Sequence, residues 1–386
     1  MRGKNQASVI LVTDAEQRQA LAAVRCLGRA GYNIVTSSVE RLTLAGSSKF
    51  SSAHITYPDP RADEQGFVAA IQRAIATHHI DAIVPTNDRD MLALAKCRDQ
   101  FPRVRITCGP LDMLMKGRDK SLTLAIARKI GVPLPYTQTI ENENDLASVK
   151  HFPVVLNPAR SSGGKGLAFC SDATSLLREY RARRSYGTFL VQERIPQSGE
   201  EVGFYAVHGP DGAPIASSVQ KRLRSYPVYG GPSTLRQIVE NTEVERLGKL
   251  LLAHIGWIGA AMVEFKRDPR DGQYKLMEIN PRFWGSLETS IASGIPFPEL
   301  LLKQFLNQPV RIPPARPVIG RWLLGDVLWL AGTFSWKSVR GFVSAFRNSH
   351  DDIFSVSDPR PFFASLGIAL LYLIHPERRR RFISRL

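Results

Sequence analysis

The first third of the chain alternates short apolar runs with amphipathic segments, and this alternation limits the folds open to it. Residues 8–13 form a β-branched apolar run, and the apolar residues within 20–31 recur at helical spacing. The same patterns repeat, with expected strands at 33–37 and 82–85 and expected helices at 67–76 and 88–97. Strands that alternate with helices form a parallel sheet covered on both faces. We therefore predict an α/β, Rossmann-like unit over residues 1–110.

The pattern changes after this unit. Strands broken by glycine-rich loops follow, which is typical of an α+β unit, and we expect it over residues 111–310. Prolines gather between residues 309 and 317 and interrupt regular structure there. A smaller, helical and basic segment is expected over 311–386. The first turn, at residues 13–17, lacks the G-x-G-x-x-G pattern, so a dinucleotide cofactor is not predicted.

A strand near residue 280 contains the most informative polar residues. Glu278 and Asn280 alternate with apolar residues, so both side chains are expected on one face. A carboxylate and an amide oxygen are hard ligands that suit Mg²⁺, and Arg282 could hold a phosphoryl group. Glu264, on another alternating strand, would add a second carboxylate. A single acidic residue on a strand is more often solvated than ligating, so it is the combination that predicts a metal and phosphate face.

A glycine-rich loop follows the apolar strand at residues 152–160. Gly163 and Gly164 allow backbone N–H groups to approach anions, and Lys165 adds a positive charge, as a phosphate-binding loop requires. A β-hairpin turn is the alternative explanation for this stretch taken alone.

The order and spacing of Glu264, Glu278, Asn280 and Arg282 resemble the metal-binding strands of the ATP-grasp superfamily, in its carboxylate–amine ligase branch. The resemblance to these carbamoyl-phosphate-synthase-like proteins extends over residues 8–309. It implies a Rossmann-like preATP-grasp domain, then a two-lobed ATP-grasp fold, then a small helical C-terminal segment.

The resemblance also implies positions for the nucleotide. Glu193, Arg194 and Ile195 would form the hinge that meets the adenine edge, and Glu201 or its neighbour Glu200 would reach the ribose hydroxyls. Lys120 matches the early phosphate-binding lysine of the family.

Two further positions concern the substrate and the phosphates. Lys221 and Arg222 resemble the basic residues of a substrate loop that receives a carboxylate or an acyl phosphate. Asn157 stands where these enzymes usually have a lysine on the ATP phosphates, and asparagine adds no positive charge. Either Lys165, Arg160 or Lys120 compensates, or turnover has been lost; the intact metal strands favour an active enzyme.

The activity implied by the resemblance is ATP-dependent ligation of a carboxylate to an amine. ATP with Mg²⁺, or with Mn²⁺ in its place, would convert the carboxylate to an acyl phosphate, which the amine attacks to give an amide, ADP and phosphate. A kinase that phosphorylates a hydroxyl group and a nucleotide-binding pseudoenzyme are the alternatives. The sequence does not identify the carboxylate or the amine.

The net charge of +16 predicts an anionic partner, although no nucleic-acid motif is present. The apolar stretches at 321–330 and 362–374 are expected to pack on the core. The alternative is peripheral contact with an anionic membrane, aided by the basic tail at Arg378 to Arg381. Four cysteines without metal-binding or paired spacing indicate buried thiols in the cytoplasm. Whether the chain forms a homodimer stays open.

Overall fold

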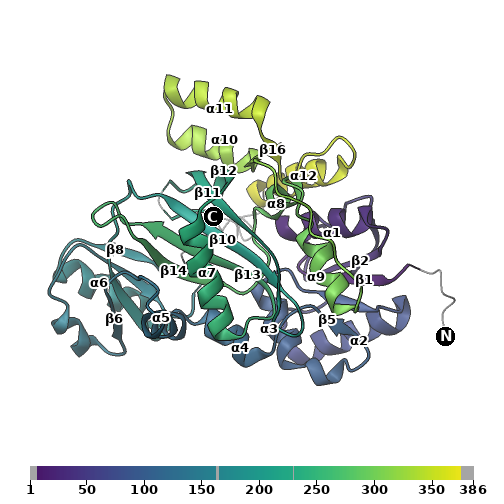
Figure 1. Cartoon of the computed structure of the whole chain (residues 1–386), viewed down its shortest axis with the longest axis horizontal. Coiled ribbons are helices and arrows are strands. Elements are labelled where there is room, and N and C mark those ends of the chain that lie inside the picture. The colour runs from purple at the N-terminus through teal and green to yellow at the C-terminus, as the bar shows by residue number, and fades with distance from the viewer. Residues whose placement is uncertain (1–6, 162–164, 229, 375–386) are drawn as a thin grey trace.

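The computed structural model describes residues 7–161, 165–228 and 230–374. Its N-terminal part is a five-stranded parallel sheet in the order β3-β2-β1-β4-β5 (Figure 1). The strands are β1 (Val9–Val12), β2 (Asn33–Ser38), β3 (Ser51–Thr56), β4 (Ala82–Val84) and β5 (Arg105–Ile106). The helices between them are α1 (Arg18–Arg29), α2 (Glu64–His78) and α3 (Asp88–Lys96). The parallel α/β sheet that the sequence predicts is present.

Strands β3 and β5 are not predicted by the sequence patterns. β3 lies at the edge of the sheet with only partly buried side chains, so it lacks a clear apolar pattern. β5 has two residues. The order of the strands reverses between β1 and β4, so their carboxyl ends open on one crevice.

A small antiparallel sheet follows, in the order β6-β9-β7-β8. It contains β6 (Thr137–Ile140), β7 (Val154–Pro158), β8 (Ala168–Cys170) and β9 (Phe189–Glu193), and α4 (Leu111–Arg118) and α5 (Lys120–Lys129) precede it. Helix α6 (Ala173–Arg183) packs on this sheet through Leu176 and Tyr180, which share a separate apolar core with Leu156 and Phe189. We call this unit the small lobe.

The large sheet has seven strands in the order β14-β13-β10-β11-β12-β15-β16. They are β10 (Glu201–His208), β11 (Pro214–Ser225), β12 (Ser233–Val239), β13 (Gly259–Arg267), β14 (Tyr274–Asn280), β15 (Ile319–Arg321) and β16 (His350–Asp351). All neighbouring strands are antiparallel except β15 and β16.

One face of the large sheet is apolar and is covered by α7 (Thr242–Ile255). The side chain of Asn241 caps the first turn of this helix by accepting a hydrogen bond from the Val244 N–H at 3.0 Å. Gly248 allows a close approach, because a Cβ there would lie 2.2 Å from the ring of Phe204. Part of the opposite face joins a second apolar cluster through Tyr205 and Met262, and the rest bears polar side chains.

The N-terminal sheet shares its core with the rest of the chain. Leu11 and Val35 belong to one continuous apolar cluster with Leu114 and Trp257. The other side of the same sheet packs, through α1, against Leu301 of α9 (Phe297–Phe305). The N-terminal unit and the large sheet are therefore packed together, whereas the small lobe has its own core.

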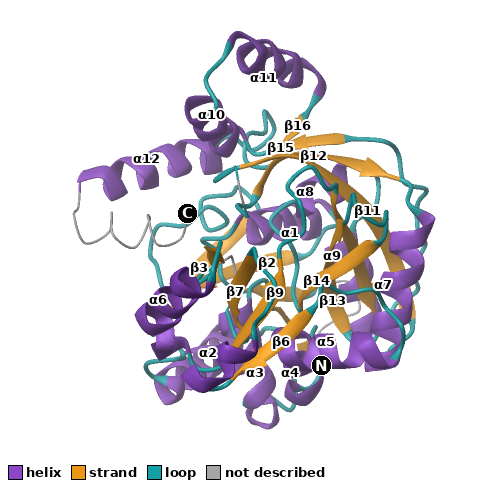
Figure 2. Cartoon of the chain, turned by 90° about the vertical axis from the view of Figure 1, so that its left-hand side faces the viewer, coloured by secondary structure: helices purple, strands orange, loops and turns teal. Residues whose placement is uncertain are grey.

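The C-terminal segment contains α10 (Leu323–Gly332), α11 (Trp336–Asn348) and α12 (Arg360–Ile374), which lie at the periphery of the molecule (Figures 1 and 2). The segment contains the expected helices and also the short strands β15 and β16, which extend the large sheet. Strand β15 pairs with β12 and so provides hydrogen-bond partners for β12 backbone groups that would otherwise lie at an open sheet edge. The tail at Arg378 to Arg381 lies outside the described residues. Within those residues no helix has the length and apolarity needed to cross a membrane.

Buried ion pairs hold the C-terminal segment to the N-terminal sheet. Asp352 accepts a hydrogen bond from Arg18 of α1 at 2.6 Å and another from Arg236 of β12. The Asp358 carboxylate accepts a hydrogen bond from Arg25 of α1 at 3.0 Å, and both side chains are almost fully buried. The chain therefore closes on itself through contacts between residues more than 300 positions apart.

Candidate active site

Two glutamates face each other at the centre of the polar face. Glu264 of β13 pairs with Glu278 of β14 in the strand register, and Asn280 lies two residues further along β14. An irregularity in the pairing sets one residue of β13 against two of β14, which buries Leu276 in the core while Glu278 stays on the polar face. Asn280 donates a hydrogen bond to Glu278 at 2.9 Å. The structure therefore brings together the three predicted metal ligands.

The two glutamates have opposite electrostatic environments. Burial raises the pKa of Glu264 to about 7, and the nearby Glu278 charge adds to this rise while Arg222 opposes it. Burial alone would also raise the pKa of Glu278, but Lys120, the Asn280 hydrogen bond and Arg282 together lower it. The surroundings therefore favour ionisation of Glu278 more than ionisation of Glu264.

Arg222 supplies the positive charge on the other side of Glu264. Its guanidinium lies 2.8 Å from Glu264 and 3.3 Å from Glu201. The sequence analysis places Lys221 and Arg222 in a loop, which is wrong, because both belong to strand β11. Successive residues of a strand point to opposite faces. Only Arg222 therefore reaches the polar face, while Lys221 pairs with Glu200 at 3.1 Å.

Lys120 joins the site from the start of α5. Its Nζ lies 3.3 Å from Glu278 and donates a hydrogen bond to the carbonyl oxygen of Ser161 at 2.7 Å. Lys120 therefore links Ser161, the last described residue before the glycine-rich stretch, to Glu278 of β14. Gly163 and Gly164 lie outside the described residues. Lys165 is exposed.

Arg282 is held by the N-terminal unit. Its Nε lies 3.2 Å from Asp88, at the start of α3, and its Nη1 donates to the carbonyl oxygen of Phe283 at 2.9 Å. The same carboxylate lies 3.2 Å from Arg118. Asp88 follows β4 at the crevice of the parallel sheet, so its pair with Arg282 joins this crevice to the end of β14.

The junction between the lobes contains the predicted hinge. Glu193 accepts a hydrogen bond from the Tyr136 N–H at 3.0 Å and pairs with Lys275 at 3.0 Å. Arg194 lies over the ring of Phe169 at 4.9 Å from its centroid, and Ile195 is buried. The Glu193 carboxylate therefore connects the small lobe to β14 of the large sheet.

Known proteins share this arrangement of sheets. A family model described as "ATP-grasp in the biosynthetic pathway with Ter operon" matches residues 189–321. The chain superposes on the biotin carboxylase complex with β,γ-ATP from Campylobacter jejuni with a TM-score of 0.69 and 18% identity, covering 82% of this chain and 76% of that one. The chain has an ATP-grasp fold. The resemblance predicted from the spacing of Glu264 to Arg282 is confirmed.

Two further known proteins are similar to this chain. An L-amino acid ligase from Bacillus licheniformis matches it with a TM-score of 0.65 and 15% identity, covering 83% of this chain and 81% of that one. The carbamoyl phosphate synthase large chain of Myxococcus xanthus is 27% identical over 305 residues, which are 74% of this chain but 27% of that protein. The present chain therefore spans about a quarter of the length of the Myxococcus xanthus protein.

Position 157 departs from the usual ATP-grasp pattern, and the structure shows its surroundings. Asn157 is buried on β7 and donates a hydrogen bond to Gln192 of β9 at 3.3 Å. Arg160 is 71% exposed in its side chain and pairs with Asp119 at 2.7 Å. Among the three cations that could compensate for the missing lysine, Lys120 alone is buried, and it lies beside the predicted metal ligand Glu278.

The polar face continues past the predicted residues. Gln220 bridges two hydroxyl groups, donating to Ser290 and accepting from Ser286, each at 2.7 Å. Arg236 pairs with Arg222 in the strand register, and its Nη1 is buried without a hydrogen-bond partner. The sequence patterns do not predict these residues. Residues 233–239 do not alternate strictly with apolar neighbours, so no local signal indicates Arg236.

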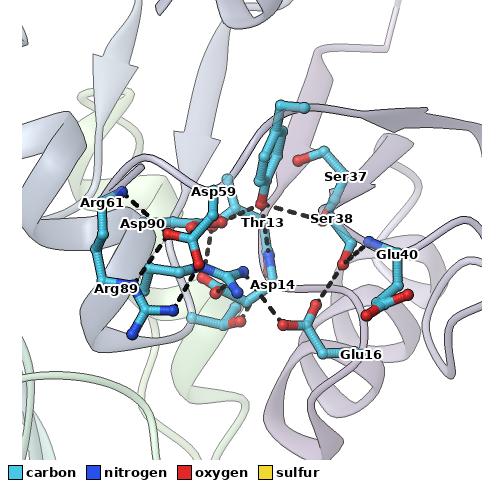
Figure 3. A network of polar contacts seen from close by, with 12 residues as sticks. Thr13, Asp14, Glu16, Ser37, Ser38, Glu40, Asp59, Arg61, Arg89 and Asp90 are labelled. Carbon is cyan, nitrogen blue, oxygen red and sulfur yellow. Dashed lines mark hydrogen bonds and ion pairs between the residues drawn. The ribbon is translucent and has the colours of Figure 1, made fainter. Parts of the chain in front are cut away.

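A second polar network fills the crevice of the N-terminal sheet (Figure 3). Arg89 pairs with Asp14 at 2.9 Å, with Asp90 at 2.7 Å and with Glu16 at 3.2 Å. Asp14 has a positive φ of 55°, which is uncommon for a residue other than glycine. Burial, then Asp90 and Glu16, raise the pKa of Asp14 well above its ordinary value. This network joins the ends of β1 and β4 and is distinct from the polar face of β13 and β14.

Proposed function

We propose that this chain is an ATP-dependent carboxylate–amine ligase that forms an amide through an acyl phosphate and releases ADP and phosphate. The observation that supports it is the opposition of Glu264 and Glu278 on neighbouring strands of a polar face, with Arg222, Lys120 and Arg282 around them. The domain limits at 110 and 310 and a cytoplasmic location belong to the same proposal.

The donor atoms on this face fit a hard divalent ion. Glu264, Glu278 and Asn280 would hold Mg²⁺, or Mn²⁺ in its place, because all three offer oxygen ligands. When bound, the ion would neutralise negative charge on the ATP phosphates. Glu193, Arg194 and Ile195 would position the adenine, Glu201 would contact the ribose, and the loop of Gly163, Gly164 and Lys165 would cover the phosphates.

The cations would stabilise the charge that develops during phosphoryl transfer. Lys120 would contact the phosphates, in compensation for Asn157. Arg282 would contact the phosphoryl group or the acyl phosphate, since Asp88 holds its guanidinium at the end of β14. Arg222, on the same face as Glu264, would receive the substrate carboxylate. Lys221 lies on the opposite face of β11, where it pairs with Glu200, and is not proposed for this role.

The proposal can be tested by supplying ATP and Mg²⁺ with panels of carboxylates and amines and measuring the release of ADP. Hydroxylamine in place of the amine should trap an acyl phosphate as a hydroxamate. A Glu278→Gln protein is the control, and both products should disappear with it.

Two results would contradict the ligase proposal. Release of ADP with a phosphorylated hydroxyl group and no hydroxamate would indicate a kinase. Saturable ATP binding without ADP release in any substrate mixture would indicate a pseudoenzyme, as the uncharged Asn157 could allow.

A further inference from the structure

The C-terminal helices expose an unusual amount of apolar surface. Of the 20 large apolar side chains that are exposed in the described part of the chain, 11 lie between residues 327 and 371. Phe334 and Trp336, where α10 meets α11, are 80% and 84% exposed. Phe346 of α11 and Phe363 of α12 are more than half exposed. We call the exposed apolar side chains between residues 327 and 371 the C-terminal apolar surface. The region matched by the family model ends at residue 321, before this surface begins.

Helix α11 is amphipathic, yet none of its residues is buried. Phe342 and Phe346 lie against the guanidinium of Arg321, so one side of the helix faces the large sheet. Trp336 and Val343 are seven residues apart and therefore lie on a common side, and both are exposed. An apolar stripe of this kind normally faces a protein core or an apolar partner, and here it has no such cover within the described chain.

The charges on this surface have one sign. Between residues 323 and 371, all of which the structure describes, the exposed charged side chains are Lys337, Arg340, Arg347 and Arg360.

The acidic residues of the same stretch face inward. Asp326 pairs with Arg224 at 2.9 Å, Asp352 with Arg18 and Arg236, and Asp358 with Arg25. The fourth, Asp351, accepts hydrogen bonds from backbone N–H groups of its own segment. No acidic side chain in this stretch is exposed, so its outward face is apolar and positively charged.

We propose that the C-terminal apolar surface docks on an anionic lipid bilayer, with α11 lying in the plane of the interface. Aromatic side chains favour the boundary between lipid and water, and basic side chains beside them are attracted to anionic headgroups by ~1 kcal/mol each. Figures 1 and 2 place α11 and α12 at the outer edge of the same half of the molecule. This interaction is independent of the ligase proposal and would bring the chemistry to a membrane surface.

The test uses the full-length chain and sedimentation with vesicles of phosphatidylcholine, with and without phosphatidylglycerol, at low and high salt. Binding should require phosphatidylglycerol and weaken at high salt. The Phe334→Ser/Trp336→Ser and Lys337→Glu/Arg340→Glu proteins should each bind about tenfold more weakly. Leu42→Ser and Arg184→Glu, at exposed positions outside the segment, are matched controls and should bind normally. Unchanged urea unfolding would show that the variants are folded.

Three results would overturn the proposal. The first is equal binding of the helix variants and the controls. The second is loss of all binding on removal of the residues after 375 when the helix substitutions have no effect, because the tail alone would then be responsible. The third is self-association of the chain that is lost with Phe334→Ser/Trp336→Ser while vesicles are not bound, which would make the surface an interface between two copies.

Discussion

At the scale of single residues, the two facing glutamates differ because their neighbours differ. Glu278 lies among Lys120, Asn280 and Arg282, which stabilise its charge, whereas Glu264 is buried beside another carboxylate with Arg222 as its main counter-ion. The divalent ion that we propose between them would reduce the repulsion between the two carboxylates.

We predict that Glu278→Gln abolishes Mg²⁺-dependent turnover and weakens Mg·ATP binding without unfolding the chain. The metal's stabilisation of phosphoryl charge amounts to several kcal/mol, so the rate should fall by about a thousandfold or more. Asn280→Ala should also lower Mg²⁺-dependent turnover and Mg·ATP affinity. Glu245→Gln, on the outer side of α7, is the matched control. Near-normal activity of Glu278→Gln would remove the metal assignment.

The substitution Asn157→Lys should maintain or increase the affinity for ATP. A lysine at this position on β7 would gain a charge-assisted contact with phosphate, and Gln192 would keep its bond to Thr137. Asn157→Met is similar in length without the charge and should bind ATP no better than the native chain. Weaker binding by Asn157→Lys in titration calorimetry would show that β7 does not face the phosphates.

The sequence could predict those site residues whose pattern is local. Glu264, Glu278 and Asn280 alternate with apolar neighbours, so their common face follows from strand geometry. Asp88 and Arg236 have no such signal, because their partners Arg282 and Asp352 are more than 100 residues away. Contacts of this range depend on how the units pack.

At the scale of elements, α1 depends on the far end of the chain. Arg25, in the middle of α1, donates to the carbonyl oxygens of Ile353 and Asp358 at 2.9 and 2.8 Å as well as to the Asp358 carboxylate. Ser48 and the Lys49 N–H complete the shell around this carboxylate at 2.7 and 3.0 Å. Apolar spacing within residues 20–31 predicted the helix α1, but it did not predict that Arg25 of this helix is buried.

Replacing Asp358 with asparagine should lower the free energy of unfolding by about 3–5 kcal/mol, because Arg25 would remain buried without its counter-ion. Urea unfolding would measure the loss. An Arg25→Met/Asp358→Leu double variant, which removes both charges, should be more stable than Asp358→Asn. Equal stability of the native and Asp358→Asn proteins would show that the pair is not a structural link.

The same pair predicts a dependence of stability on pH. Burial would raise the pKa of Asp358, but the hydrogen bonds from Lys49, Ser48 and Arg25 outweigh it and lower the pKa below its ordinary value of 3.8. Folding favours the ionised Asp358 carboxylate. Its contribution to the free energy of unfolding is therefore full above pH 3.8 and is lost as the pH falls through the lower pKa that Asp358 has in the folded chain. Below that ordinary value, the difference in stability between the native chain and Asp358→Asn should therefore shrink.

At the scale of the whole molecule, the sequence boundary at residue 110 does not coincide with a gap in the core. The N-terminal sheet shares apolar clusters with the large sheet on one side and with α9 on the other, whereas the small lobe keeps a core of its own. Periodicity predicts where strands and helices lie, but it does not show which of their faces are shared between units.

The fragment of residues 1–110 should consequently fail to unfold cooperatively. Separated from Leu114, Trp257 and Leu301, it would expose apolar surface on both sides of its sheet. Circular dichroism during urea unfolding, with the intact chain as the control, would test this. A sharp transition of the isolated fragment would establish the N-terminal unit as an independent domain.

The ion pairs of the C-terminal segment also limit how the protein can be shortened. Deleting everything after β15 to obtain a better-behaved protein would remove Asp352 and Asp358 together with the exposed aromatic residues. Arg18, Arg25 and Arg236 would then lack their buried counter-ions. Arg236 is the strand neighbour of Arg222 on the polar face of the large sheet, so the loss would extend to the candidate site. A truncation intended to improve solubility would damage the interior instead, so point substitutions on the outer surface are the safer route for crystallisation.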